Sequence, residues 1–365
     1  MDALRGLIII AMALDHANVF IAREHPPPEF WSSPPAYYTS ALAFLTRFVT
    51  HFAAPGFFFL IGAGMVLFAE SRRQQGWSEG AIVRHLIARG GLLVALQLLV
   101  ENPAWQIGSD TPFGPQVFLS YFGVLYGLGT ALIVGALLLR WRPAALIGLG
   151  LTTALATELV ISQLRTTGTV PSPLLQLLLV PGRTSGFTVY YPLIPWLGLV
   201  LFGMAFGRWL APNPAHAYRR AAIVGVSLLA LFPVIRLAGG FGNLQPPAGP
   251  GWVAVLNVVK YPPSIVFILL TLGVDLLLLA LLARAGEQLV RWVWPALMFG
   301  RVPLFFYIAH LYLYGLIGLA LGQRGVGIPR MYPFWLLGLA ILYPLCWLYG
   351  RFKHSRAPGS LWRLF

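Results

Sequence analysis

Long apolar runs separated by short polar stretches recur along the whole chain of 365 residues. An α-helix needs about 20 apolar residues to span the ~30 Å hydrocarbon core of a bilayer, and most of these runs approach that length. The pattern predicts an all-α polytopic membrane protein with about ten transmembrane helices, which we treat as a single integral membrane domain over residues 1–365. The predicted spans are Leu4–Ile21, Ala41–Ala69, Ile82–Val100, Val117–Leu139, Ala144–Ser162, Tyr191–Leu210, Ala221–Leu237, Ser264–Ala283, Val302–Leu321 and Phe334–Gly350.

The most informative ionisable residues lie in three of these apolar runs. Asp15 and His16 lie in the first run, Arg47 and His51 in the second, and His310 in the ninth. A charged group at the centre of a bilayer costs roughly 2.5 kcal/mol or more, so such residues persist mainly where they face a cavity or a partner. The sequence therefore predicts a polar site for reaction or transport inside the membrane.

Depth along the helices brings three of these residues together. At 1.5 Å per residue, His16 lies ~12 Å below the outer boundary of the core, and Arg47 and His51 lie ~9 Å and ~15 Å below it. Residues four apart share a helix face, and a short connection makes the first two spans neighbours. We expect the three side chains to converge on one pocket. An interhelical hydrogen bond could equally account for each buried histidine.

Asp15 needs separate treatment because it is adjacent to His16. Successive helical side chains diverge by about 100°, so Asp15 cannot simply orient His16, and Asn18 is its better helical neighbour. An ion pair between Asp15 and Arg47 that only stabilises the helices is the main alternative to a catalytic role.

Composition supports the membrane assignment and charge indicates the topology. Hydrophobic residues make up 58% of the chain and charged residues 10%, against about 25% charged in soluble domains. The net charge of +14 does not indicate nucleic-acid binding, because the basic residues lie at loop ends rather than in one patch. Counted from a cytoplasmic start, the inner loops hold 16 of the 25 basic residues and the outer loops 7. We predict a multi-pass protein of the cytoplasmic (inner) membrane with both termini in the cytoplasm.

Other local features add four expectations. The first run lacks a basic leader and a cleavage site, so it should remain as a span. The outer loop Arg23–Ser40, with three consecutive prolines from Pro26, predicts a rigid lid because proline lowers the entropy lost on ordering. The single cysteine, Cys346, allows no intrachain disulfide and should serve packing. The histidines show no metal-ligand spacing, so we expect no metal.

Five segments, in this order, carry a family resemblance over nearly the whole chain: Asp2–His16, Thr46–Gly62, Tyr191–Gly203, Lys260–Ser264 and Gly300–His310. The first segment reads Asp-x-x-Arg-Gly and then a histidine eleven residues after the arginine. Together they resemble the heparan-alpha-glucosaminide N-acetyltransferase family and its bacterial relatives, and more distantly the acyltransferase-3 family.

The resemblance implies a transmembrane acyltransferase-like bundle that moves an acetyl group from cytoplasmic acetyl-CoA to a sugar amine or hydroxyl at the outer face. The expected partners are acetyl-CoA, a sugar or glycan acceptor and the lipid bilayer, with a homodimer allowed and no nucleic acid. In the lysosomal branch an asparagine stands where this chain has His16, and the proposed catalytic histidine lies in the loop after the first span. The nearest residue here is His25.

Acyl transfer from a thioester needs a base for the acceptor proton and a donor that stabilises the oxyanion. We assign His16 as the general base, with His25 as the alternative, and Asp15 as electrostatic support. Direct transfer and a route through an acetyl-imidazole on either histidine both remain open. The other candidates are His51 in catalysis, Arg47, Asn18, His25 and His310 as substrate or oxyanion contacts, and Arg5 and Arg301 for the CoA phosphates.

A multispan transporter or flippase for a polar or lipid-linked substrate is the alternative function. Buried charges, helices interrupted by glycine and proline and about ten spans are also typical of that class. The chain shows neither paired symmetry between its halves nor an acidic proton relay, which favours the transferase. A purely structural membrane component is a third possibility.

Overall fold

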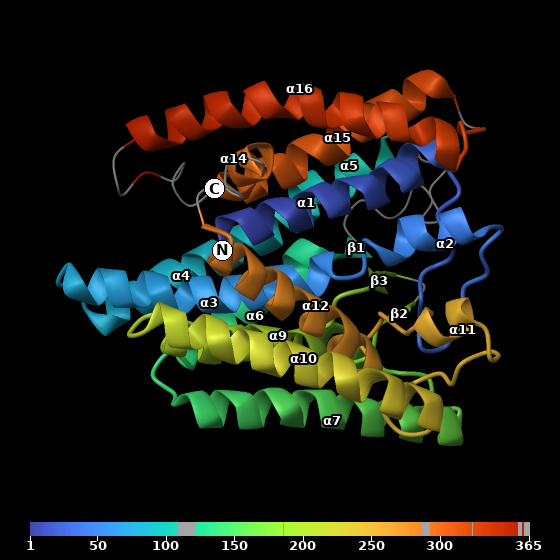
Figure 1. Ribbon diagram of the computed structural model, residues 1–365, viewed down its shortest axis with the longest axis horizontal. Coiled ribbons are helices and arrows are strands. Elements are labelled where there is room, and N and C mark those ends of the chain that lie inside the picture. The colour runs from blue at the N-terminus through green and yellow to red at the C-terminus, as the bar shows by residue number, and fades with distance from the viewer. Residues whose placement is uncertain (108–120, 185, 287–292, 323, 357–359, 361–365) are drawn as a thin grey trace.

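The computed structural model describes residues 1–107, 121–184, 186–286, 293–322, 324–356 and 360 (Figure 1). Within these residues, nine helices are long and apolar enough to cross a membrane, which confirms the prediction of an all-α polytopic membrane protein. The predicted span Val117–Leu139 corresponds to a shorter helix, Val124–Leu137, and its first four residues lie outside the described ranges.

The long helices run side by side along the longest axis of the molecule (Figure 1). In chain order the helices are α1 Asp2–Ala17, η1 Asn18–Ala22, α2 Ala41–Phe48, α3 Ala53–Gln74, α4 Glu79–Leu96, η2 Gln97–Glu101, α5 Asn102–Gln106, α6 Val124–Leu137, α7 Pro143–Thr167, α8 Pro173–Leu178, α9 Leu193–Leu210, α10 Pro214–Ala238, α11 Trp252–Leu256, α12 Ile265–Arg284, α14 Trp294–Arg301, α15 Pro303–Leu321 and α16 Ile328–Ser355. The strands are β1 Tyr121–Phe122, β2 Gly182–Arg183 and β3 Thr188–Val189, in the order β1-β3-β2.

The second predicted span is wrong in one respect, because it is two helices rather than one. α2 ends at Phe48 and α3 begins at Ala53, with a turn between them. Pro55 has no N–H to donate to the carbonyl of His51, four residues earlier, and its ring clashes with that carbonyl in a continuous helix. In the turn, Thr50 Oγ1 donates to the Arg47 carbonyl at 2.7 Å. Arg47 and His51 therefore do not share one face of a regular helix.

Two π-helical turns, η1 and η2, lie within spans that the sequence predicts as plain helices. η1 continues α1 from Asn18 and ends before Arg23, which takes a left-handed conformation with φ 56°. η2 continues α4 and ends at Glu101. Such turns are rare and occur often at functional sites, because they rotate the following side chains relative to a regular helix.

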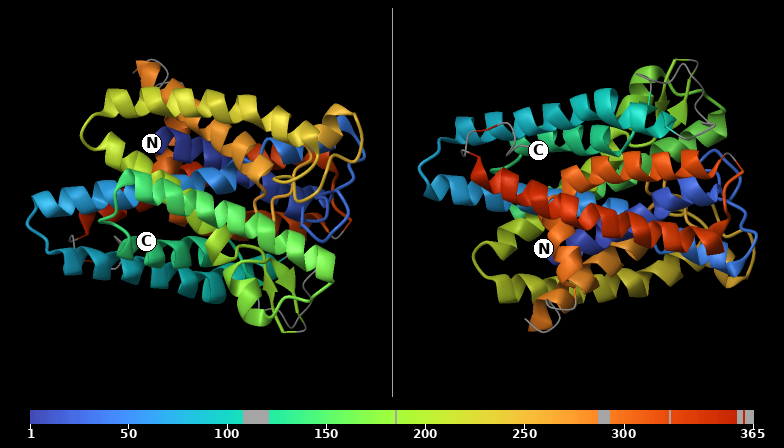
Figure 2. Two further views of the ribbon diagram at one scale, coloured as in Figure 1. Left: turned by 90° about the horizontal axis from the view of Figure 1, so that it is seen from below. Right: turned by 90° about the horizontal axis from the view of Figure 1, so that it is seen from above.

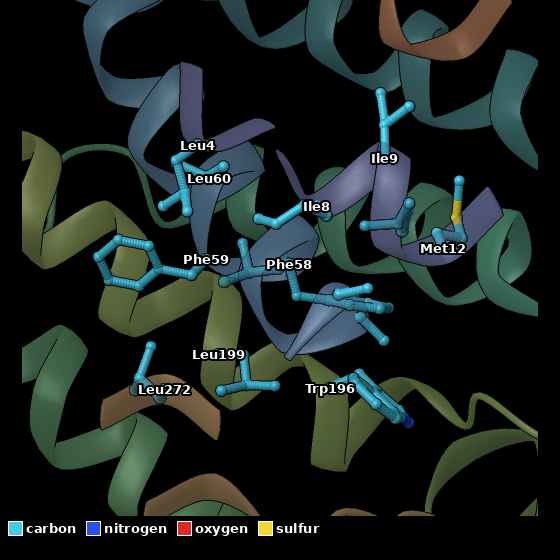
Figure 3. Packing of buried hydrophobic residues seen from close by; sticks show 14 of the residues in the cluster. Leu4, Ile8, Ile9, Met12, Phe58, Phe59, Leu60, Trp196, Leu199 and Leu272 are labelled. Carbon is cyan, nitrogen blue, oxygen red and sulfur yellow. The ribbon is translucent and has the colours of Figure 1, made fainter. Parts of the chain in front are cut away.

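α3 lies at the centre of the bundle and packs against α9, α1, α6 and α12. Small residues allow the closest approach, since a Cβ on Gly62 would overlap the Val200 carbonyl of α9. Figure 3 shows the apolar side chains of α1, α3 and α9 that fill this centre, including Ile8, Phe58 and Trp196. The tight packing fixes α1 against α3, which places the polar residues of both near one another.

One end of the bundle carries α2, α11 and the short strands, and we call it the loop end (Figure 1; Figure 2). The segment 23–33 folds back over this end, where Trp31 N donates to the Tyr261 carbonyl at 2.9 Å. The predicted lid is therefore an ordered cover. Arg236 of α10 holds the adjoining loop, because its buried guanidinium donates to four backbone carbonyls and to Asn243.

α1 begins and α16 ends at the opposite end of the bundle, together with the turn between α3 and α4 (Figure 1). A chain that starts and ends on the same side must cross the membrane an even number of times. The nine long helices of the described residues and the shorter α6 together give ten crossings. We call this the turn end. Arg72 and Arg73 lie there at the end of α3, as the distribution of basic residues predicts for one face of the membrane.

Candidate active site

A cavity of about 500 Å³ lies inside the loop end. α1, the turn after α2, η2, α15 and the loop before α12 each contribute to its wall. Its volume falls within the roughly 300–1,000 Å³ of typical small-molecule sites. Its polar or ionisable lining residues include Asp15, His16, Arg23, His25, Arg47, Thr50, Glu101, Trp105, Tyr121, Tyr190, Tyr191, Lys260, Tyr261 and Tyr307.

His16 and His310 form a directed hydrogen-bond chain. His16 Nδ1 lies 2.6 Å from His310 Nε2, and His310 Nδ1 lies 2.9 Å from the Phe306 carbonyl. A carbonyl oxygen can only accept, so His310 Nδ1 carries the proton and, in the neutral ring, Nε2 accepts from His16 Nδ1. The chain leaves the lone pair of neutral His16 on Nε2. His16 borders the cavity, while His310 is fully buried behind it.

Arg47 is the centre of a buried ion cluster. Its Nη1 donates to both carboxylate oxygens of Asp15 at 2.7 Å, and its Nε and Nη2 donate to Glu29 at 2.8 and 2.6 Å. Thr50 Oγ1 also reaches Asp15, at 3.0 Å. Only 1% of Arg47 is exposed. The cluster joins α1, α2 and the cover 23–33, because one residue of each contributes a charge.

Glu29 itself lies outside the membrane-spanning segments, in the cover. Burial opposes its ionisation, but Arg47, with a smaller contribution from His51, holds the pKa of the Glu29 carboxyl well below its usual range. The ion pair that anchors the cover is therefore intact at neutral pH.

The other two histidines of the site region differ in their access to the cavity. His25 lines it, with Nδ1 2.7 Å from the Pro26 carbonyl and Nε2 3.4 Å from Asp15. Both nitrogens of His25 face acceptors, so neither directs a free lone pair into the cavity. His51 donates from Nδ1 to the Arg47 carbonyl and lies 3.5 Å from Glu29, behind the cluster and away from the described lining.

Aromatic rings form much of the cavity wall. The Trp105 ring meets His16 edge-on at 5.0 Å between centroids. A row of ring contacts follows, with centroid distances of 6.3 Å from Trp105 to Tyr121, 5.3 Å from Tyr121 to Tyr190 and 5.1 Å from Tyr190 to Tyr261. Such a surface presents flat apolar faces together with hydroxyl groups, an arrangement suited to an amphipathic ligand.

Two carboxylates and one ammonium group of the site region were not among the candidates of the sequence analysis. Glu101 is buried in the wall, where Trp105 Nε1 donates to its Oε1 at 3.1 Å and its Oε2 has no partner in the described ranges. It sits one residue beyond the predicted span Ile82–Val100, and η2 carries it inside. Glu29 and Lys260 come from loops. Their only sequence signal was position, Glu29 directly after the prolines and Lys260 at the head of a resemblance segment.

The remaining candidates lie elsewhere. Asn18 is buried and does not belong to the described lining. Arg5 donates to Asp2 and to the Gly300 carbonyl at 2.8 and 3.0 Å, so it lies beside the end of α14 at the turn end. Arg301 is exposed there, over the Trp294 ring. Neither arginine lines the cavity. No group of three or more metal-binding side chains occurs among the residues that the structure describes.

Comparison with known proteins identifies a family for this chain. The family model described as heparan-alpha-glucosaminide N-acetyltransferase, catalytic, matches residues 1–239. No curated protein matches the chain. The matched region holds His16, His25, Arg47 and Glu101, and it ends before Lys260, Tyr307 and His310 complete the cavity region.

Proposed function

Because the chain belongs to the heparan-alpha-glucosaminide N-acetyltransferase family, we propose that it transfers acetyl from cytoplasmic acetyl-CoA to a sugar amine or hydroxyl at the outer face. Membership makes it a membrane protein of an acetyltransferase family, and the nine long apolar helices found among the described residues agree with that. The donor, the acceptor and the face of the membrane are the proposal.

The observation that carries the proposal is the lone pair that the His16–His310 chain leaves on His16 Nε2. In the proposed reaction this nitrogen removes the proton from the acceptor amine or hydroxyl as that group attacks the thioester carbonyl. The tetrahedral oxyanion then collapses, the C–S bond breaks and the CoA thiolate leaves. A thiolate is a far better leaving group than an alkoxide, so the main task of the protein is positioning and proton removal.

We assign the buried charges a supporting role. Arg47 has five N–H donors, and four of them already meet Asp15 and Glu29. One N–H remains for an oxyanion, so Arg47 acts chiefly by fixing α1, α2 and the cover around the substrate. The aromatic wall supports a saccharide acceptor, since apolar faces of sugar rings pack on aromatic rings while ring hydroxyls meet tyrosine hydroxyls.

The donor must reach this site from the turn end. Arg5 lies eleven residues before His16 on α1, a rise of ~16 Å. We propose that Arg5 and Arg301 hold the CoA phosphates there and that the thin pantetheine arm extends between helices toward His16. The same arrangement supports one integral membrane domain, because residues from both halves of the chain are needed.

A transfer assay with purified full-length protein tests the function. Protein in lipid nanodiscs receives labelled acetyl-CoA and glucosamine, and we expect N-acetylglucosamine to form with wild type and not with His16→Ala. Arg324→Ala, outside the cavity lining, is the control for mutagenesis and purification. If His16→Ala is active and His25→Ala is inactive, His25 is the general base instead of His16. Uptake of intact acceptor into vesicles without acetylation would favour a transporter.

A further inference from the structure

Lys260 places a buried ammonium group in the cavity wall. It belongs to the loop between α11 and α12, and only 4% of the residue is exposed. The backbone N–H groups of Lys260 and Tyr261 both donate to the Glu29 carbonyl, at 3.2 and 3.0 Å. The lysine is therefore held in place by the same cover that Arg47 anchors.

Few protein groups offset the cost of burying the positive charge of Lys260. Within the described residues it makes no hydrogen bond or ion pair within 4.0 Å, and its contact is the Tyr261 ring at 5.2 Å from Nζ to the centroid. Asp15 and Glu29 direct their oxygens toward Arg47 instead. Burial, reinforced by the positive charge of Arg47, lowers the pKa of Lys260 to about 8. A buried cation with unused donors is costly unless a ligand supplies the acceptors.

We propose that Lys260 binds an oxyanion carried by the acceptor, a carboxylate or a phosphate on the sugar, and so selects acidic acceptors. The proposal rests on the proposed acyl-transfer function and names the chemical class of its acceptor. Three N–H donors on a flexible stem suit a carboxylate or phosphate oxygen. The lysine lies at the loop end, beside the cover and the tyrosines, whereas the assigned CoA arginines lie at the turn end.

A second account of Lys260 is long-range neutralisation. Asp15 and Glu29 carry two negative charges against the single positive charge of Arg47, and Lys260 is close enough for both carboxylates to act on it. In that account the lysine stabilises the cluster and has no contact with substrate. The two accounts differ in what a substitution does, because lost neutralisation affects every acceptor equally whereas a lost contact affects acidic acceptors selectively.

The test compares acceptors of different charge. Wild type in nanodiscs is given labelled acetyl-CoA with glucosamine, glucosamine 6-phosphate, a glucosaminyl-glucuronate disaccharide or the methyl ester of that disaccharide. We expect at least a tenfold preference in kcat/KM for one or both anionic acceptors, and the two anionic arms distinguish phosphate from carboxylate. Lys260→Met should reduce that preference at least tenfold, mainly through KM of the anionic acceptor, and Lys260→Arg should retain it.

The chain offers a matched control, because its other lysine, Lys353, lies near the end of α16. Lys353→Met should leave the acceptor preference at the wild-type value. Equal losses of Lys260→Met on all acceptors, or no anionic preference in wild type, would overturn the proposal.

Thermal stabilisation separates failure of the inference from failure of the function. Glucosamine 6-phosphate and the disaccharide should raise the Tm of wild type and Lys260→Arg, and Lys260→Met should lose that shift. If this binding pattern appears while no acceptor is acetylated, the oxyanion site stands and the acetyltransferase assignment fails. If neither anionic sugar shifts the Tm and glucosamine, which carries no anionic group, is acetylated, the function stands and the inference fails.

Discussion

At the scale of single residues, the direction of the His16–His310 hydrogen bond decides which nitrogen of His16 keeps a lone pair. The Phe306 carbonyl fixes the tautomer of His310, and His310 in turn fixes that of His16. His310 is not one of the described residues that line the cavity. Its proposed role is therefore to position His16. Without His310, His16 should stay in place, but its proton would no longer be fixed on Nδ1.

His310 substitutions test this directly. His310→Leu should lower kcat by roughly 10- to 100-fold, less than the ~10²–10⁴-fold of a general base because His16 itself remains, while KM for acetyl-CoA changes little. His310→Gln should recover part of the loss, since its amide oxygen can accept from His16 Nδ1. Steady-state kinetics should give kcat values that fall from wild type to His310→Gln and then to His310→Leu. Equal activity of the leucine and glutamine variants would contradict the positioning role.

Glu29 gives a pH dependence of stability with a definite sign. Its pKa is lowered in the folded state from an ordinary value of 4.5, so its contribution is present above that value and is lost as the pH falls through the lower folded pKa. Glu29→Gln leaves Arg47 with fewer charge partners and should cost about 3 kcal/mol, seen as a lower Tm at pH ~7. Between pH ~5 and ~3 its Tm should fall less than that of wild type.

Glu24→Gln is the matched control, because Glu24 is exposed in the same loop. We expect its melting curve to follow wild type across the whole pH series. Two results would contradict the anchoring role of the Arg47–Glu29 pair. One is a wild-type Tm that stays constant between pH ~5 and ~3, and the other is a Glu29→Gln protein as stable as wild type at neutral pH.

Part of the site could be predicted from the residues alone. Depth along two helices brought Asp15 and His16 near Arg47 because a helix rises by a constant 1.5 Å per residue. The same reasoning placed His51 in the pocket, and the structure puts it behind Glu29. Glu29 and Lys260 were not foreseen as site residues, since loops have no regular rise and their burial depends on what folds over them.

At the scale of elements, hydropathy located the spans well because the energy of burying an apolar run in lipid depends on length and composition. It did not reveal the turn between α2 and α3 or the two π-helical turns. Averaging over a window conceals a local change of backbone path. Pro55 was the one visible signal for the first of these, and the π-helical turns had none that the pattern analysis used.

The loop between α10 and α11 depends on Arg236 to a degree that its sequence position does not suggest. Arg236→Met would remove five hydrogen bonds and leave four backbone carbonyls without that donor. We expect a loss of about 3 kcal/mol or more, together with faster proteolysis within residues 239–257. Melting curves and limited proteolysis measure both.

Arg219→Met is the control for this experiment, since Arg219 lies on the same helix and is exposed. Its Tm and proteolysis rate should match wild type. Unchanged proteolysis in Arg236→Met would mean that the loop is held by other contacts.

At the scale of the whole molecule, the turn end and the loop end face opposite sides of the membrane in the proposed mechanism. A reporter after Gly76, in the turn after α3, should signal the cytoplasm, and one after Gly249, between α10 and α11, should signal the outside. The basis is the excess of arginine and lysine in the loops of the turn end. Reversed signals would place the cavity on the cytoplasmic side and remove the need for transfer across the membrane.

The hydrogen bond between His16 and His310 joins residues that are 294 positions apart. At the usual rate of synthesis of about 5–20 residues per second, the ribosome makes the second histidine roughly 15–60 s after the first. During that interval the first helix is already made, yet its imidazole lacks the neighbour that sets its tautomer. If His16 is the base that we propose, its full activity therefore requires insertion of the ninth span, and a nascent or prematurely terminated polypeptide holds this histidine without its positioning partner.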